Sequence, residues 1–342
     1  MKIKDIEIPY EKDRSFRYRI FEVLPGLLTW SMFVAPFVLA FFAPHVLIFI
    51  FITYILIWFV KSIGMLVRNF QGLNRMESFM SLDWRSMNND LQEGFIRTKE
   101  ATPSWHYDNI GRVKDTKPND IYHAIIVAAY NETREILEPT IQSVLESNYD
   151  MKRVILVLAY EGRDGAKSER PCLDLADEYG HSFAGVITVK HPFNPKEVRG
   201  KGGNITFAAR ELEIYLQKSN INPDNVVVTT LDSDNRPHRQ YLPALTYLYV
   251  VCPDPLYASF QPVPIYTNNI WDAPAPMRVI ATGNSFWNIV LSMRPHMIRN
   301  FSSHAQGMSA LIKTDYWSVR TVVEDGHQFW RTYFRFDGRH EV

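Results

Sequence analysis

The sequence predicts an α/β domain with a doubly wound, mostly parallel sheet, preceded by a hairpin of two apolar helices. Two observations carry this prediction. Buried-type strand patterns alternate with helical patterns from residue 118 onward, and no Asp, Glu, Lys or Arg occurs in the 38 residues between Glu22 and Lys61. Strand–helix alternation is typical of parallel sheets, and a charge-free run of this length is typical of membrane-spanning segments.

The composition argues against several classes of protein. Hydrophobic residues make up 46% of the 342 residues, charged residues 22%, and the formal net charge is zero. This balance argues against a nucleic-acid partner and against global disorder. Cys172 and Cys252 are too few for a disulfide framework or a zinc cluster, which favours a reducing, cytoplasmic setting.

The charge-free run is too long for a single crossing. As one helix it would span about 57 Å, against a hydrocarbon core of about 30 Å. Ala43-Pro44-His45 divides it, so we expect transmembrane helices at about 24–43 and 46–67, within an N-terminal segment 1–67. Pro36 is tolerable in a membrane helix. A buried hairpin in a soluble core is the alternative.

Basic residues on both flanks predict the orientation of this hairpin. Residues 1–22 and 61–100 each hold six Lys or Arg, and the turn between the helices holds none; the twelve are Lys2, Lys4, Lys12, Arg14, Arg17, Arg19, Lys61, Arg68, Arg75, Arg85, Arg97 and Lys99. The positive-inside rule then places both ends in the cytoplasm. We expect a multi-pass protein of the cytoplasmic (inner) membrane, in contact with lipid.

An interfacial connector is expected at 68–117, where Trp84, Trp105 and Tyr107 are candidates for the lipid interface. A cytoplasmic domain follows at 118–342. Its predicted strands are 122–130, 153–160, 185–190 and 225–234. Three helices are predicted between them. The first is capped by Asn131 or Thr133, the second covers 168–180, and the third begins at a glycine-rich turn at residue 200.

Two carboxylates, Asp232 and Asp234, end the last of these strands. If the strand continues that far, both side chains leave the same face of the pleat. Like charges so close repel unless a cation or ligand needs them, and Mg²⁺ typically takes one or two carboxylates plus substrate phosphates. The pair therefore predicts a metal–phosphate site at the ligand-binding edge of the sheet. A solvated turn is the alternative.

Other polar groups fall at the same edge. They follow the first strand (128–132), the second strand (160–164) and the glycine-rich turn "RGKGGN", whose Lys201 at a helix entrance suits a diphosphate. Each has a simpler alternative as a helix start, a turn or a flexible loop.

Five motifs follow one another along the chain: "VAAYNE" (127–132), "LVLAYEGRDG" (156–165), "RGKGGNITFA" (199–208), "TTLDSDN" (229–235) and "VVEDGHQFW" (322–330). Taken in this order, they resemble membrane-bound family-2 glycosyltransferases with the GT-A fold, and in particular polysaccharide synthases. The resemblance covers about two thirds of the chain. It implies transfer of a sugar from a nucleotide-diphosphate donor, with UDP favoured, to a saccharide or lipid-linked acceptor in polysaccharide biosynthesis.

The resemblance also implies donor-binding residues. Ala129, Tyr130 and Glu132 would line the base and ribose pocket, and Glu161 stands where the family has an acidic contact to uracil. The family's usual Asp-Asp-Gly-Ser is replaced here by Glu161-Gly162-Arg163-Asp164-Gly165, and the longer carboxylate changes the fit to the base.

The resemblance also implies that Lys201 approaches the diphosphate and that Asp232 faces the ribose or the diphosphate. Asp234, together with Asp232, would be the metal ligand for Mg²⁺ or Mn²⁺. A metal there would neutralise charge on the leaving diphosphate.

Asp325 is the implied catalytic base, and Glu324 is the reserve candidate. A base opposite the leaving group takes the proton of the acceptor hydroxyl, and one displacement inverts the anomeric centre. Asp325 can instead be the N-cap of the following helix. His304 is a candidate acceptor contact, with a structural role as the alternative.

The chain departs from the family at its end. It stops 17 residues after Asp325, without the usual Gln/Arg-x-x-Arg-Trp motif and later membrane helices. We therefore expect a fragment, a chain that works with a second membrane subunit, or a chain inactive alone. A non-catalytic nucleotide-sugar-binding subunit is the alternative function, and a nucleotidyltransferase of related fold is a third.

Overall fold

A computed structural model describes residues 6–97, 102–114 and 116–342. The helices are α1 (Phe16–Phe42), α2 (Pro44–Ser81), α3 (Trp84–Glu93), α4 (Ser104–Ile110), α5 (Arg134–Leu145), α6 (Ala166–Tyr179), α7 (Lys201–Lys218), α8 (Tyr241–Val251), α9 (Ala275–Ser292), α10 (Met308–Lys313) and α11 (Glu324–Arg335). The strands are β1 (Tyr122–Ala129), β2 (Val154–Glu161), β3 (Gly185–His191), β4 (Val226–Asp232), β5 (Ser259–Phe260) and β6 (Ala305–Gly307).

The predicted doubly wound, mostly parallel sheet is confirmed. Its strand order is β3-β2-β1-β4-β6-β5. β1 pairs in parallel with both β2 and β4, and β2 pairs in parallel with β3, whereas β6 pairs antiparallel with both β4 and β5. The chain adds β2 and β3 on one side of β1 and then β4 on the other side. Because these strands are parallel, the polar groups at the carboxyl ends of β1, β2 and β4 meet at one edge of the sheet.

Apolar side chains alternate between the two faces of the sheet. Ala124 and Ile126 of β1 pack with α7 and α10, whereas Ile125 and Val127 pack with α5 and α6. This period of two, with helices on both faces, buries β2 along its whole length and most of β1 and β4. The rigid sheet thereby fixes the positions of the side chains at its edge.

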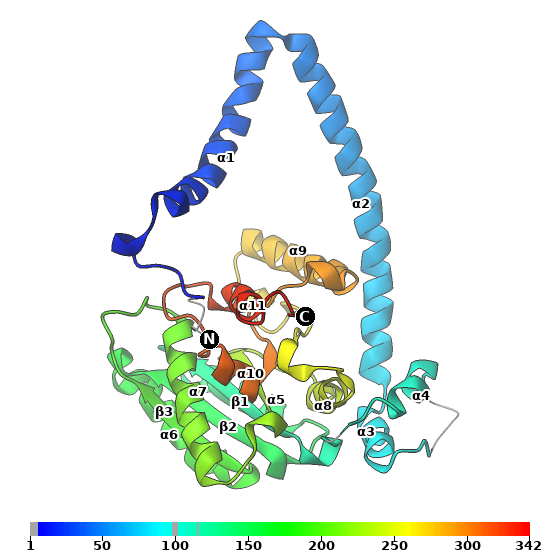
Figure 1. The fold of residues 1–342 in the computed structure, drawn as a ribbon, viewed down its shortest axis with the longest axis vertical. Coiled ribbons are helices and arrows are strands. Elements are labelled where there is room, and N and C mark those ends of the chain that lie inside the picture. Colours follow the sequence, from blue (N-terminus) through cyan, green and yellow to red (C-terminus); the bar gives the residue numbers. More distant parts are fainter. Residues whose placement is uncertain (1–5, 98–101, 115) are drawn as a thin grey trace.

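Two long helices precede this domain and form a hairpin whose apex, at Ala43, lies far from the sheet (Figure 1). α1 has 27 residues and α2 has 38, and both are long and apolar enough to cross a membrane. They are longer than the predicted 24–43 and 46–67. The Ser15 side chain caps α1 by accepting from Tyr18 N at 3.2 Å, and no proline interrupts α2 after its first residue. Lys2, Lys4 and Lys99 of the basic flanks lie outside the described residues.

The predicted connector 68–117 is divided between α2 and two short helices that pack on the domain. Trp84 is 2% exposed, in a cluster with Tyr247 of α8, so its predicted place at the lipid interface is wrong. The indole is large enough to fill the space between α3 and α8, and its Nε1 donates to Phe79 O at 2.8 Å.

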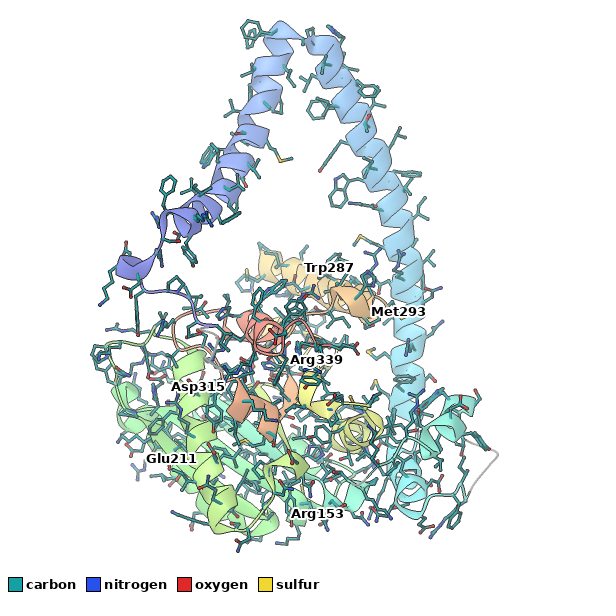
Figure 2. The ribbon with its side chains drawn as sticks, viewed as in Figure 1. Arg153, Glu211, Trp287, Met293, Asp315 and Arg339 are labelled. Carbon is teal, nitrogen blue, oxygen red and sulfur yellow. The ribbon has the colours of Figure 1, made fainter. Side chains whose placement is uncertain are left out.

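α9 attaches the lower half of α2 to the rest of the domain. A Cβ on Gly72 of α2 would lie 2.6 Å from Ile289 Cγ2 and 2.8 Å from Ile289 O, so the two helix backbones approach closely. Met293, at the end of α9, lies beside α2 (Figure 2). The C-terminal part of α2 is therefore packed against the domain.

Candidate functional site

Seven residues predicted to bind the donor or the metal line one pocket of about 430 Å³ at the carboxyl edge of the sheet. They are Ala129, Tyr130, Glu132, Glu161, Lys201, Asp232 and Asp234. Ala128, Arg163, Gly200, Asn204 and Ser233 complete the lining. The topology explains this gathering, because β1, β2, β4 and the start of α7 all end or begin at that edge.

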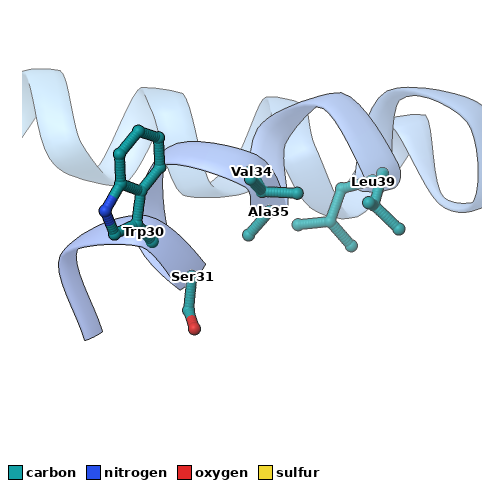
Figure 3. A pocket seen from close by; sticks show the side chains of 6 residues that line it. Trp30, Ser31, Val34, Ala35 and Leu39 are labelled. Carbon is teal, nitrogen blue, oxygen red and sulfur yellow. The ribbon is translucent and has the colours of Figure 1, made fainter. Parts of the chain in front are cut away.

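A different hollow, of about 530 Å³, lies on α1 between Trp30 and Leu39 (Figure 3). Its lining is apolar except for the hydroxyl of Ser31. It contains no ionisable group, so acid–base or phosphate chemistry has no support there.

The centre of the pocket is an ion pair between Lys201, the first residue of α7, and Asp232, the last residue of β4. Lys201 Nζ lies 2.6 Å from Asp232 Oδ1. Burial alone would raise the pKa of Asp232, but the charge and hydrogen bond of Lys201 and the hydroxyl of Ser302 together lower it. The Asp232 carboxylate therefore remains ionised at neutral pH.

β4 ends at Asp232, and Asp234 lies in the following turn. The strand does not continue through Asp234, so Asp232 and Asp234 do not lie on one face of a pleated strand. The side chain of Asn235 stabilises the turn by accepting a hydrogen bond from Asp232 N at 3.1 Å. Asp234 is exposed, and its nearest donors are the amides of Asn235 and Asn269, at 3.5 and 3.4 Å.

These contacts bear on where a divalent cation fits. Both oxygens of Asp232 already accept hydrogen bonds, from Lys201 and Ser302, whereas the two donors near Asp234 are long by hydrogen-bond standards. Within residues 6–97, 102–114 and 116–342, no three His, Cys, Asp or Glu side chains gather as a metal cage. Of the two carboxylates, Asp234 thus has the oxygens that are open to a hard cation.

Ser302 joins Asp232 to Asp325. Its hydroxyl donates to Asp232 Oδ2 at 2.7 Å, and its backbone N donates to Asp325 Oδ2 at 2.6 Å. Ser302 has φ +49°, in the left-handed region that is rare for residues other than glycine. The strained backbone turns one serine toward both carboxylates.

The two candidate bases have different environments. Asp325 is partly exposed, and its oxygens accept from two backbone N–H groups, those of Ser302 and Gly326. Glu324 is 6% exposed, and burial raises its pKa. Its Cβ lies against Gly202 of α7, where an added Cβ would come within 3.1 Å. Asp325 is thus the more accessible of the two carboxylates.

Glu161, at the end of β2, lies against the side chains of Arg163 and His191. Its Oε2 lies 3.1 Å from Arg163 Nε and 3.4 Å from His191 Nδ1, and Arg163 also stacks on the ring of Tyr130 at 4.7 Å. His191 Nε2 lies 3.0 Å from Glu197. Burial alone would lower the pKa of His191, but the hydrogen bond and charge of Glu161 and the charge of Glu197 raise it.

Glu132 shapes the loop that follows Ala129, the last residue of β1. Glu132 accepts from the backbone N of Tyr130, and the intervening Asn131 has φ +63°. Because Asn tolerates the left-handed region, the chain can turn sharply there and leave the ring of Tyr130 on the pocket wall.

His304 is 1% exposed, and its Nε2 accepts from Trp317 Nε1 at 3.0 Å. Burial, assisted by the charge of Lys201, lowers the pKa of His304 to about 4. Of the two predicted roles, these contacts favour the structural one.

Sequence reasoning missed three residues of the site. Arg163 and Asn204 line the pocket, and Asn204 donates to Ala159 O at 3.0 Å while its buried Oδ1 has no partner among the described residues. Asn204 lies within the glycine-rich motif at 199–208, so the sequence could have predicted that it lies at the site. Ser302 belongs to none of the five motifs, and only the fold brings it to Asp232.

The comparisons with known proteins are distant. No family model and no curated protein matches the chain. Among solved structures, it is similar to the mannosyltransferase PcManGT from Pyrobaculum calidifontis in complex with GDP-Man and Mn²⁺, with 15% identity, a TM-score of 0.41, and coverage of 77% of this chain and 62% of that one. It is also similar to S. aureus TarS 1–349, with 10% identity, a TM-score of 0.36, and coverage of 64% and 55%. The chain thus spans less than two thirds of either structure.

Proposed function

We propose that this protein is a metal-dependent, inverting glycosyltransferase of the family-2 type, which transfers a sugar from a nucleotide-diphosphate donor to an acceptor at a membrane. The observation that carries the proposal is the link through Ser302 between Asp232, in the pocket, and Asp325. Sugar transfer needs a cationic site for the leaving diphosphate and an accessible base close to it, and here one residue connects the two.

In this proposal the donor's base lies against Tyr130, Arg163 and Glu161, and its diphosphate lies at the start of α7. The N-terminus of an 18-residue helix, with Gly200 as its cap and Lys201 as its first residue, favours an anion through its free N–H groups and its dipole. A divalent cation at Asp234, when bound, would neutralise charge on the diphosphate.

The chemical step is a single displacement. The acceptor hydroxyl oxygen forms a bond to the anomeric carbon as the bond from that carbon to the phosphate oxygen breaks. The electron pair leaves with the diphosphate, beside the Lys201 ammonium, and Asp325 takes the hydroxyl proton. Attack from the side opposite the leaving group inverts the configuration.

Membrane attachment is the second part of the proposal. The start of α1 and the end of α2 both face the domain, and the apex between them lies away from it (Figure 1). If the hairpin crosses a bilayer, the domain of residues 118–342 lies on the side of the basic flanks, which is the cytoplasmic side. A saccharide or lipid-linked acceptor, and a second membrane subunit, fit this location.

The test is nucleotide release by the purified chain in detergent, across UDP- and GDP-sugar donors, with Mn²⁺, Mg²⁺ or EDTA. We expect metal-dependent turnover in the wild type, little in Asp325→Asn or Asp234→Ala, and full turnover in the matched control Asp108→Asn, whose side chain is exposed on α4. Metal-dependent nucleotide binding without turnover would instead support a binding subunit. No binding of any nucleotide-sugar would refute the proposal.

A further inference from the structure

The segment Glu7–Tyr10, ahead of α1, lies against the loop Ser318–Val323 that leads into α11 (Figure 1). Ser318 Oγ donates to Glu7 Oε2 at 3.1 Å, and Arg320 Nη1 donates to Ile8 O at 3.0 Å. The guanidinium of Arg320 also stacks on the ring of Tyr10 at 4.0 Å. The two parts of the chain, more than 300 residues apart in sequence, are therefore joined by side-chain and backbone contacts.

Glu7 also pairs with Arg331, on α11. Arg331 is 2% exposed, its Nη1 contacts Glu7 Oε1, and its Nη2 donates to Thr314 O at 2.8 Å. Burial lowers the pKa of Arg331, and the charge of Glu7 opposes that shift. A buried guanidinium without a carboxylate partner is strongly unfavourable, so Glu7 stabilises this arrangement of α11.

The same loop and the residue before it, Trp317, also pack on the entrance of α7. Val198 N donates to Val319 O at 2.9 Å, and Thr206 of α7 donates to Trp317 O at 3.0 Å. A Cβ on Gly202 would lie 2.3 Å from Ser318 O. The loop thus contacts both the N-terminal segment and the entrance of the helix that carries Lys201.

We propose that Glu7 is a positioning residue for the candidate base. It holds the loop before Asp325 through Ser318 and the helix after Asp325 through Arg331, so both flanks of the base depend on one carboxylate. The segment that contains Glu7 leads directly into α1, which couples the first apolar helix to Asp325. This role rests on the proposed glycosyl transfer, and none of the five sequence motifs includes Glu7.

The experiment compares Glu7→Gln with Glu11→Gln, its matched control. Both glutamates precede α1, and Glu11 is exposed and has no described side-chain partner. The first readout is amide hydrogen exchange in peptides covering 318–331. We expect exchange there to be at least about tenfold faster in Glu7→Gln, unchanged in Glu11→Gln, and partly restored in Glu7→Asp.

The second readout is kinetic. In Glu7→Gln we expect kcat to fall about tenfold or more, with the Kd for the free nucleotide unchanged within about twofold, because the donor pocket is intact and only the base is displaced. Glu11→Gln should match the wild type in both quantities.

Two results would overturn the inference. One is equal exchange in 318–331 for the two variants. The other is a loss in Glu7→Gln of kcat and nucleotide affinity together, with faster exchange throughout the sheet, which would mean general destabilisation. If the wild type has no turnover, the proposed activity fails, and hydrogen exchange still decides whether Glu7 positions the loop.

Discussion

Replacing Gly202 with alanine tests whether the packing of α7 against the loop before α11 sets the geometry of the site. The added Cβ would lie 2.3 Å from Ser318 O, whereas an ordinary contact needs at least about 3.4 Å. The backbone must therefore yield by about 1.1 Å, the difference between these distances. Neither partner is a flexible side chain, so the loop, the helix or both must move.

The size of the effect follows from this displacement. Overpacking of a well-packed interior costs about 1–3 kcal/mol, which corresponds to a fall in Tm of roughly 2–12 °C for a domain of this size. A shift of about 1 Å at a catalytic group can reduce turnover about 100-fold, and the loop ends at Glu324 and Asp325.

The assay is thermal unfolding followed by nucleotide release at saturating donor, with Gly111→Ala as the control. No atom lies within 4 Å of a Cβ at Gly111, so both quantities should match the wild type there. Wild-type Tm and turnover in Gly202→Ala would refute the reasoning, because they would mean that the loop can move without affecting the base.

Three further predictions concern single contacts of the site. Ser302→Ala removes the hydroxyl donor to Asp232 but keeps the N–H donor to Asp325; since a hydrogen bond to a charged group contributes about 1.5–3 kcal/mol, we expect kcat/KM to fall about tenfold or more, and an unchanged value would contradict the role of the bridge. Asp234→Asn should abolish Mn²⁺ binding in the presence of UDP, measured by electron paramagnetic resonance. Mn²⁺ binding equal to that of the wild type would show that Asp234 is not the metal ligand. His191 has a raised pKa, so its ionic stabilisation is fully present below its unfolded pKa of about 6.5 and is lost as pH rises through the higher folded value. The stability difference between wild type and His191→Gln, from chemical denaturation, should therefore be larger at pH 6 than at pH 9, and a difference independent of pH would contradict this account.

Local sequence patterns were sufficient for the sheet and for most of the pocket. β1, β2 and most of β4 are runs of apolar and β-branched residues, a pattern typical of strands that are buried on both faces, and the structure buries them so. Once their order is known, the polar residues that follow them must meet at one edge. This is why Glu161 and Asp232 lie in one pocket although 71 positions separate them in sequence.

The errors and omissions arose where tertiary contacts decide the outcome. Trp84 is buried because α8 covers it, and its sequence neighbours give no sign of that helix. Ser302 reaches Asp232 only because β6 pairs with β4 and carries the preceding segment to the sheet edge. Likewise, the pairing of Glu7 with Arg331 spans almost the whole chain, and no local pattern encodes such a contact.

The length of α2 has a mechanical consequence for a protein attached to a bilayer. If the crossing ends near Val67, the remaining 14 residues to Ser81 extend about 21 Å beyond it. α9 is packed against this extension at Gly72, and α3 follows it almost without a break. The domain then behaves as one body with the helix. A transmembrane helix accommodates a thinner bilayer by tilting, so a change in membrane thickness would turn the mouth of the pocket relative to the lipid surface and alter which acceptors reach it.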